Sequence, residues 1–273
     1  MNIKKIALFG NPVYHSKSPI IHKIFSYITN IPYSYNKINV SNKNFNIIAK
    51  NFFDFGGYGA NITLPFKKKA FYLCDLLTER AKLSKSVNVI TKINNKYLLG
   101  DNTDGIGFIN DLKRLYIIYK KKKILIIGAG GAARGIIPPL LLYNNNIIIT
   151  NRTLEKAKKI SKEFNNLGNI KYISNKKLFN KKFDIIINAT SCSIKNKLPN
   201  LFNNIINSNT FCYDMVYSKK NTYFLKWCLR KSKYINDGLG MLISQAAYSF
   251  LLWHNKMPSI KLSIEIFKKI NYN

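Results

Sequence analysis

The sequence predicts a two-domain α/β protein, and three observations lead to this prediction. The chain has 273 residues, 47% of them hydrophobic, which is enough for roughly two domains with separate cores. Short β-rich runs alternate with helical patterns over residues 3–103, and a second alternating series begins at Lys122. After Gly238 the pattern is helical. Alternation of this kind is typical of an α/β domain followed by a doubly wound domain.

The first domain is expected to begin with a strand and a helix. Ile6 to Phe9 is a short apolar run, and Ser18-Pro19 opens a segment whose apolar residues recur at helical spacing. Serine can cap the free amides of a helix, and proline suits the first helical position. A second helix is expected over residues 44–55, ended by Gly56-Gly57. Further strands are expected at 35–40, 59–64 and 88–93.

The second domain is expected to start at Ile124 to Ile127, which is fully apolar like a strand buried in a parallel sheet. The helix that follows this strand contains Pro138-Pro139, so we expect it to be kinked or short. A clear helix is expected over residues 154–164. The partner strands are expected at 146–150, 170–173, 183–189 and 211–216.

A glycine-rich segment follows the apolar strand directly. Residues Gly128-Ala129-Gly130-Gly131-Ala132-Ala133 match G-x-G-x-x-G/A, in the strand-to-helix context that this motif requires. The glycines allow a tight turn and close approach of the backbone to a pyrophosphate, whose charge then meets the free amides of a helix N-terminus. A purely structural turn is the alternative, but the context favours a dinucleotide site.

The residues after the second strand of this domain indicate which dinucleotide binds. A free ribose 2′-hydroxyl usually meets an Asp or Glu about 20 residues after the first glycine, but this chain has Asn151-Arg152-Thr153 there. A carboxylate would repel a 2′-phosphate, whereas a guanidinium can bind it with paired hydrogen bonds. Lys156 adds another positive charge. The sequence therefore predicts NADP, with the alternative that Arg152 is one more cation in a cation-rich chain.

Three polar clusters outside the glycine-rich segment follow expected strands, at residues 11–18, 61–67 and 101–105. Loops at the carboxyl ends of strands form the usual ligand crevice of open α/β sheets, so these side chains can converge on a polyhydroxylated substrate. Lys67 begins a helix, where its charge faces the positive end of the macrodipole and is mildly unfavourable for structure. With Asp104 nearby it could transfer a proton at a substrate oxygen. A solvated lysine and a helix-capping aspartate are the structural alternatives.

Charge and cysteine content narrow the functional class. A formal net charge of +32 favours anionic ligands and would by itself suggest nucleic acid. The lysines, however, are dispersed along the chain without a nucleic-acid-binding motif, so we expect no specific nucleic-acid partner. The four cysteines and three histidines lack metal-ligand spacing, so neither a disulfide nor a metal site is expected. No segment approaches the roughly 18 apolar residues of a membrane span, and we expect a cytoplasmic protein.

Seven segments, taken in order, resemble the shikimate dehydrogenase family over nearly the whole chain. They are residues 9–19, 59–67, 100–105, 151–153, 188–191, 214–217 and 237–247. The resemblance implies an enzyme that uses NADPH to reduce 3-dehydroshikimate reversibly to shikimate, in aromatic amino acid (chorismate) biosynthesis. It also implies a substrate-binding α/β domain over 1–103, a Rossmann NADP-binding domain over 104–236, and C-terminal helices over 237–273 that pack back on the substrate domain. The reaction would then lie in a cleft between the domains.

The resemblance also implies roles for individual residues. Lys67 would be the catalytic proton-transfer residue, paired with Asp104. The shikimate site would be lined by these two and by Ser16, Ser18, Thr63, Asn88, Tyr217 and Gln245. NADP would be held by Gly128, Ala129, Gly130, Gly131, Ala132, Asn151, Arg152, Thr153, Leu154, Glu155, Lys156, Met215 and Gly238, with Glu79 near the nicotinamide side.

Four positions depart from the family pattern. Lys85 stands where a small residue is usual, and Val89 stands where a threonine usually follows the substrate-binding Asn88. Ser193 replaces a common glycine, and Lys156 replaces a common arginine, which keeps the charge but loses the planar fork. None of these departures removes a proposed catalytic group.

Two alternatives stay open at this point. One is a quinate/shikimate dehydrogenase of the same family, because the sequence does not resolve an extra substrate hydroxyl. The other is a basic nucleic-acid-binding protein on an inactive dehydrogenase fold, against which the intact Lys67 and Asp104 argue. A monomer and a homodimer are both compatible with the sequence.

Overall fold

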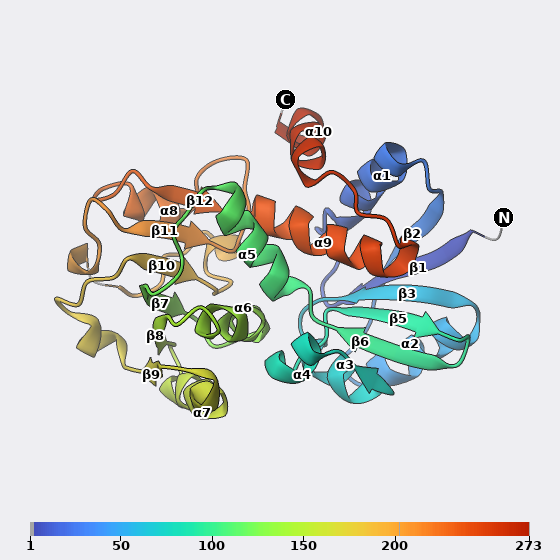
Figure 1. Ribbon diagram of the computed structural model, residues 1–273, viewed down its shortest axis with the longest axis horizontal. Coiled ribbons are helices and arrows are strands. Elements are labelled where there is room, and N and C mark those ends of the chain that lie inside the picture. The colour runs from blue at the N-terminus through green and yellow to red at the C-terminus, as the bar shows by residue number, and fades with distance from the viewer. Residues whose placement is uncertain (1–2, 202, 273) are drawn as a thin grey trace. The chain divides into compact units, whose positions relative to one another are not determined.

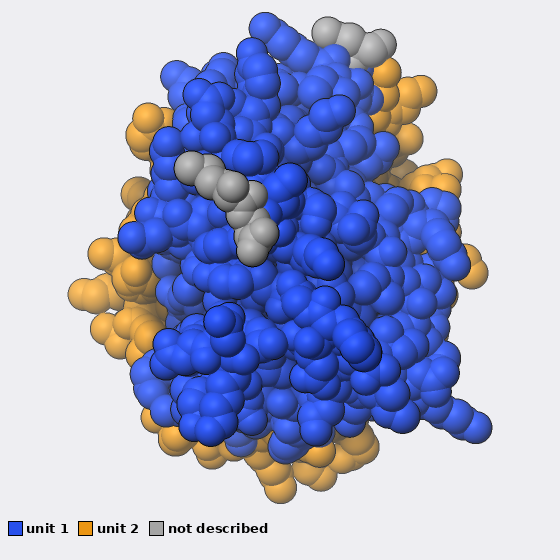
Figure 2. Space-filling view, turned by 90° about the vertical axis from the view of Figure 1, so that its right-hand side faces the viewer, with its two compact units in different colours: residues 1–107, 242–273 blue, residues 108–241 orange. Residues whose placement is uncertain are grey.

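The computed structural model describes residues 3–201 and 203–272 and divides the chain into two compact units. Unit 1 consists of Met1–Gly107 and Leu242–Asn273, and unit 2 of Phe108–Met241. Two stretches far apart in the sequence therefore build unit 1 together, as the colouring of Figure 2 shows. The chain leaves unit 1 within helix α5 (Asp104–Arg114) and returns within helix α9 (Leu239–His254).

Unit 1 is built on a six-stranded mixed sheet in the order β2-β1-β3-β5-β6-β4. Its first three strands pair in parallel, whereas β5 is antiparallel to both β3 and β6. The strands are β1 (Lys4–Gly10), β2 (Tyr33–Asn39), β3 (Gly57–Ile62), β4 (Leu76–Leu77), β5 (Val89–Ile93) and β6 (Tyr97–Asp101). The helices confined to this unit are α1 (Ser18–Thr29), α2 (Phe45–Asp54), α3 (Lys67–Leu73), α4 (Glu79–Ser84) and α10 (Ile260–Tyr272).

Alternate residues of β1 bury their side chains on opposite faces of this sheet. Phe9 belongs to a core with residues of α2, α3 and α4, including Phe45 and Ala70. Ile6 packs instead against Val89 and Trp253, which α9 supplies. Helices α1 and α10 lie side by side (Figure 1). The C-terminal segment thus completes the core of unit 1.

Several local details of unit 1 differ from the sequence-based prediction. Ser18 does not cap α1, because it is the first helical residue and Lys17 holds the cap position. The Ser16 hydroxyl, two residues earlier, instead accepts the Ser18 amide at 3.2 Å. A serine therefore still satisfies one of the free N–H groups at the start of the helix. The sequence did not predict β4, β6 or α4. Strand β6 follows β5 through Asn94 and Asn95, both with positive φ, as a tight hairpin requires.

Unit 2 is a parallel sheet in the order β12-β11-β10-β7-β8-β9. Numbered within the unit, this order is 6-5-4-1-2-3, the dinucleotide-binding arrangement whose direction reverses between β7 and β10. The strands are β7 (Lys123–Ile127), β8 (Asn146–Thr150), β9 (Ile170–Tyr172), β10 (Ile185–Asn188), β11 (Phe211–Asp214) and β12 (Ile235–Asp237). The α-helices confined to this unit are α6 (Gly131–Leu141), α7 (Leu154–Phe164) and α8 (Tyr223–Cys228). The predicted class, two α/β domains with one doubly wound, is confirmed.

Burial on both faces explains the continuous apolar run of β7. Ile124 and Ile126 belong to one core, with residues of α6 and α7, whereas Leu125 and Ile127 belong to another, with residues of α8. Helix α6 was expected to be kinked or short; it has 11 residues, as many as α7, so it is not short. Both prolines lie near its end, so few helical hydrogen bonds are lost. Among the described residues, no helix is long and apolar enough to cross a bilayer.

Candidate active site

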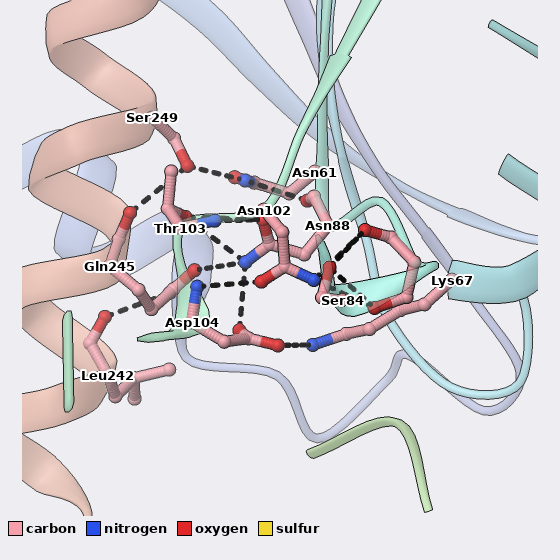
Figure 3. A network of polar contacts seen from close by, with 11 residues as sticks. Asn61, Lys67, Ser84, Asn88, Asn102, Thr103, Asp104, Leu242, Gln245 and Ser249 are labelled. Atoms are coloured by element: carbon pink, nitrogen blue, oxygen red, sulfur yellow. Dashed lines mark hydrogen bonds and ion pairs between the residues drawn. The ribbon is translucent and has the colours of Figure 1, made fainter. Parts of the chain in front are cut away.

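The centre of the candidate site is an ion pair in unit 1 between the first residues of two helices. The Lys67 ammonium at the start of α3 donates to Oδ2 of Asp104 at the start of α5 (Figure 3). Only 16% of the Lys67 side chain and 7% of the Asp104 side chain are exposed. This burial does not fit the alternative of a solvated lysine.

Asn88 connects this ion pair to Thr103 and to helix α9. Its side-chain NH₂ group lies 2.8 Å from Asp104 Oδ1, 3.1 Å from Thr103 Oγ1 and 3.2 Å from Gln245 Oε1. Its side-chain oxygen accepts the Thr103 amide at 2.8 Å. Asn88 directly precedes β5, whereas Gln245 lies on α9, and Figure 3 shows both side chains pointing to the same place. Both oxygens of Asp104 are therefore held by the protein.

A second set of contacts fixes the backbone that carries Asp104. Asn102 is buried, and its side-chain oxygen accepts the Asp104 amide at 3.1 Å. Its NH₂ group donates to the carbonyl oxygen and the hydroxyl of Ser86, at 3.0 and 2.8 Å. One residue earlier, the Asp101 carboxylate accepts from the Arg80 guanidinium and from Thr78 Oγ1. Residues 101–104 are thus held by hydrogen bonds to α4 and its N-cap at one end and to Ser86 at the other.

The network continues from Asn61 toward α9 and β2. The NH₂ group of Asn61 donates to Ser249 Oγ at 2.9 Å, and its side-chain oxygen accepts from Tyr35 Oη at 2.8 Å. Ser249 lies one turn after Gln245 on α9, and its hydroxyl donates to the Gln245 carbonyl at 3.1 Å. Helix α9 therefore contributes two polar residues to the network of unit 1.

The structure joins four of the predicted substrate residues by hydrogen bonds: Lys67, Asn88, Asp104 and Gln245. Ser16 and Ser18 lie together at the start of α1, with their hydroxyls 3.1 Å apart. Thr63 directly follows β3 and is half-buried. Both groups lie at the carboxyl ends of neighbouring parallel strands, β1 and β3.

The eighth predicted substrate residue, Tyr217, belongs to unit 2, where it follows β11 and is half-buried. Sequence patterns alone predicted no role for four residues of this network: Asn102, Thr103, Tyr35 and Ser249. Asn102 and Thr103 lie in a polar cluster that the sequence did indicate, and Ser249 has helical i,i+4 spacing from Gln245. The polar cluster and the i,i+4 spacing were the sequence signals that could have identified these three residues.

In unit 2, the glycine-rich turn has the geometry expected of a phosphate-binding turn. Gly128 has φ +112°, and a Cβ there would lie 2.9 Å from the Ala189 carbonyl oxygen, so only glycine fits. A Cβ on Gly130, by contrast, would meet no atom within 4 Å. Gly130 is the N-cap of α6, and the amide of Arg134 makes the first helical bond to its carbonyl. The amides of residues 131–133 thus lack helical acceptors beside an open space, which suits an anion.

The segment after β8 presents two cations that have no carboxylate partner in the described part of the chain. Arg152 and Lys156 are exposed, and neither forms an ion pair with any residue in 3–201 or 203–272. The side chain of Asn151 donates to the Thr153 carbonyl at 2.9 Å, which shapes the turn into α7. Leu154 and Glu155 begin that helix, and the Glu155 carboxylate lies 3.8 Å from Lys158. These features fit a 2′-phosphate.

The other residues assigned to the cofactor differ in their surroundings. Met215 follows β11 and is half-buried against the core of unit 2. Gly238 must be glycine because a Cβ would overlap the Met215 carbonyl oxygen. Glu79 lies in unit 1 at the start of α4, where its carboxylate pairs with Lys82 at 2.8 Å and is 80% exposed. Within the described residues, no group of three or more His, Cys, Asp or Glu residues could hold a metal ion.

The departures from the family pattern are accommodated locally. Lys85 ends α4 with φ +49°, a conformation that costs a residue with a side chain roughly 1 kcal/mol. Val89 is fully buried against Ile6 and Trp253. Ser193 is buried and donates to Asp214 at 2.6 Å.

Comparisons with known proteins cover nearly the whole chain. The model of the shikimate dehydrogenase substrate binding domain matches residues 8–90, and that of shikimate / quinate 5-dehydrogenase matches residues 112–200. A shikimate dehydrogenase (NADP(+)) from Buchnera aphidicola subsp. Cinara cedri (strain Cc) is 49% identical, covering 97% of this chain and 95% of its own. The enzyme of that name from Buchnera aphidicola subsp. Schizaphis graminum (strain Sg) is 47% identical, covering 95% of both chains.

A solved structure shares the fold as well. The shikimate 5-dehydrogenase from Thermus thermophilus, in complex with NADP(H) and shikimate, has a TM-score of 0.88 and 26% identity, covering 98% of this chain and 99% of its own. Two family models, relatives near half identity and a matching fold lead to one conclusion. The chain belongs to the shikimate dehydrogenase family.

Proposed function

We propose that this chain catalyses the reversible NADP-dependent reduction of 3-dehydroshikimate to shikimate, with Lys67 and Asp104 transferring the proton. Its membership of the family and its NADP-dependent relatives place it among oxidoreductases that act on the CH–OH group of shikimate. One observation carries the assignment of the proton-transfer residues: Lys67 and Asp104 form a largely buried ion pair whose second carboxylate oxygen is bound by Asn88.

The proton-transfer role follows from what reduction of a ketone requires. NADPH, when bound, supplies a hydride to the carbonyl carbon. The carbonyl oxygen must gain a proton, and an ammonium such as that of Lys67 can donate it. Asp104 holds the ammonium in place through Oδ2, while Asn88 holds Oδ1. In the oxidation direction, the amine of Lys67 would take the proton from the substrate hydroxyl.

The remaining polar residues of unit 1 are proposed to bind the other substrate groups. The hydroxyls of Ser16 and Ser18 lie 3.1 Å apart at the start of α1, where free amides favour a carboxylate. Thr63, Asn88 and Gln245 offer short hydrogen-bonding groups that suit hydroxyls. Tyr217 from unit 2 is included by resemblance alone.

The cofactor assignments in unit 2 rest on space and charge. The open space at Gly130 and the free amides of α6 fit a pyrophosphate. Arg152 and Lys156 can bind a 2′-phosphate because they have no carboxylate partner among the described residues. The assignments of Met215, Gly238 and Glu79 rest on the resemblance, and Gly238 also has a packing reason to be glycine.

One assay tests the proposed reaction. Purified protein is given shikimate or quinate with NADP or NAD in parallel, and nicotinamide absorbance is followed. We expect the highest kcat/KM with shikimate and NADP. A higher kcat/KM with quinate would favour the quinate/shikimate alternative, and no turnover with any combination would refute the proposal.

We also infer a cytoplasmic enzyme without a specific nucleic-acid partner. All four cysteines are free, which fits a reducing compartment. Both a monomer and a homodimer are compatible with this function. A measurement of the molar mass of the protein in solution would distinguish the two.

A further inference from the structure

Unit 2 contains a buried carboxylate to which the proposed function gives no role. Asp214 is the last residue of β11 and is fully buried. It accepts four hydrogen bonds, from Ser193 Oγ and Thr222 Oγ1 at 2.6 Å each, and from Asn188 Nδ2 and the Val216 amide at 3.1 Å each. Burial raises the pKa of Asp214 above its ordinary value, and these hydrogen bonds offset only part of that rise. Its donors come from the end of β10, from the loops after β10 and β11, and from the N-cap of α8.

The same contacts lead from Asp214 to the glycine-rich turn. Asn188, the last residue of β10, accepts the amide and hydroxyl of Thr190 at 3.1 and 2.7 Å. A Cβ on Gly128 would lie 3.0 Å from the Thr190 methyl group and 2.9 Å from the Ala189 carbonyl oxygen. The loop after β10 therefore packs directly on the turn after β7. This is the point where the strand order reverses, and ligands of open α/β sheets bind there.

We infer that Asp214 and Ser193 are positioning residues, which hold the loop 189–193 against the Gly128 turn in the arrangement that binds NADP. The inference rests on the proposed function. Neither residue needs to touch the cofactor, because both act through Asn188 and Thr190. The Ser193 side chain anchors the loop, because its hydroxyl donates to Asp214 at 2.6 Å and accepts from Asn188 at 3.2 Å.

The energetic consequence is specific to cofactor binding. Without the Ser193 hydroxyl, the loop is free to adopt more conformations before NADP binds. Binding must then order it, at a cost of about 0.5 to 1.5 kcal/mol per immobilised side chain. The NADP dissociation constant should therefore rise by about 2-fold to 13-fold. The chemistry at Lys67, in the other unit, should be unaffected once NADP is bound.

The test compares Ser193→Ala with a matched control, Ser161→Ala. Both serines are buried to the same extent, and Ser161 Oγ donates to the Ile170 carbonyl at 3.0 Å, at the beginning of β9. The control thus removes a buried serine hydrogen bond at the β9 edge of the same sheet, away from the glycine-rich turn. NADP dissociation constants from direct titration, Tm, kcat and both Michaelis constants are measured for each variant. Asp214→Asn is a second variant, for which we expect an equal or larger loss of NADP affinity.

The inference predicts that Ser193→Ala weakens NADP binding and raises the KM for NADP, with kcat and the KM for shikimate within about 2-fold of wild type. Ser161→Ala should lower Tm with no change in NADP affinity. If Ser193→Ala changes Tm alone, as the control does, Ser193 is only structural and the inference is wrong. If the wild-type protein itself binds no NADP, the proposed function fails, and the inference fails with it.

Discussion

The ammonium of Lys67 and the carboxylate of Asp104 form an ion pair in which neither side chain is more than one-sixth exposed. The other oxygen of that carboxylate accepts from Asn88 at 2.8 Å. A lysine held in this way presents a proton at a fixed position. A solvated lysine, such as the neighbouring Lys68, does not.

Lys67→Ala should lower kcat by roughly 10²-fold or more, because a positioned acid–base group contributes about that factor. Binding of shikimate should weaken much less. The matched control is Lys68→Ala, since Lys68 is the next residue on α3 and is exposed. Steady-state kinetics across pH distinguish the two variants. Near-normal turnover in Lys67→Ala, or an equal loss in both variants, would rule out the proposed role.

Asn102→Ala should reduce kcat by about 10-fold, because the Asp104 amide loses its side-chain acceptor and the link from this segment to Ser86 is broken. Asn145 offers a matched control, since it is also buried and bridges two backbone groups, the Lys122 amide and the Leu140 carbonyl. Each substitution should destabilise the fold by about 1 to 3 kcal/mol, measured by chemical denaturation. Only Asn102→Ala should slow turnover. A similar kcat in both variants would contradict a positioning role for Asn102.

Arg152→Ala should weaken NADP binding by roughly 10-fold to 150-fold, because a charge-assisted contact is worth about 1.5 to 3 kcal/mol. The affinity for NAD should hardly change. The control is Lys159→Ala, which removes an exposed cation from the neighbouring helix α7. Titration of each protein with both cofactors gives the comparison. An equal loss of NADP and NAD affinity would mean that Arg152 supports the fold instead of binding the phosphate.

His22 should make the fold sensitive to mild acid. Burial lowers its pKa to about 3, and its ring stacks on Tyr35 with centroids 4.0 Å apart. An unfolded histidine binds a proton near pH 6.5, so the unfolded state gains more protons as pH falls between these two values. Stability is therefore lost from about pH 6.5 downward, by up to about 1.4 kcal/mol per pH unit.

Chemical denaturation at about pH 7.5 and pH 5 tests this expectation. His22→Gln should lose about 2 kcal/mol less stability between these pH values than the wild type. His15→Gln removes an exposed histidine and should retain the wild-type loss. The half-buried His254 is present in both variants, so the difference isolates His22. An identical pH dependence in all three proteins would refute the assignment.

The net charge of +32 should give only weak, non-specific binding to nucleic acid. Such binding depends on release of counterions and falls steeply as salt rises. Fluorescence anisotropy with unrelated duplexes at about 50 and 200 mM salt measures both properties. Tight, sequence-selective binding at the higher salt would contradict the conclusion drawn from the dispersed lysines.

The sequence by itself determined the features that depend on residues close together in the chain. The buried parallel strand at 124–127, helix α7 and the glycine-rich turn were all predicted within one or two residues. Each depends on a local pattern: a continuous apolar run, helical spacing, or glycines between a strand and a helix. Lys67 and Asp104 were found in the same way, as polar residues after expected strands.

Only the tertiary structure decided how distant segments meet. Asn88 contacts Gln245, 157 positions later in the chain, because α9 returns to unit 1. Gly238 is glycine because the Met215 backbone lies against it. Asp214 collects donors from three segments that have no common sequence pattern. Hydrogen bonds and close packing of this kind depend on the positions of atoms in the folded chain, which local patterns do not specify.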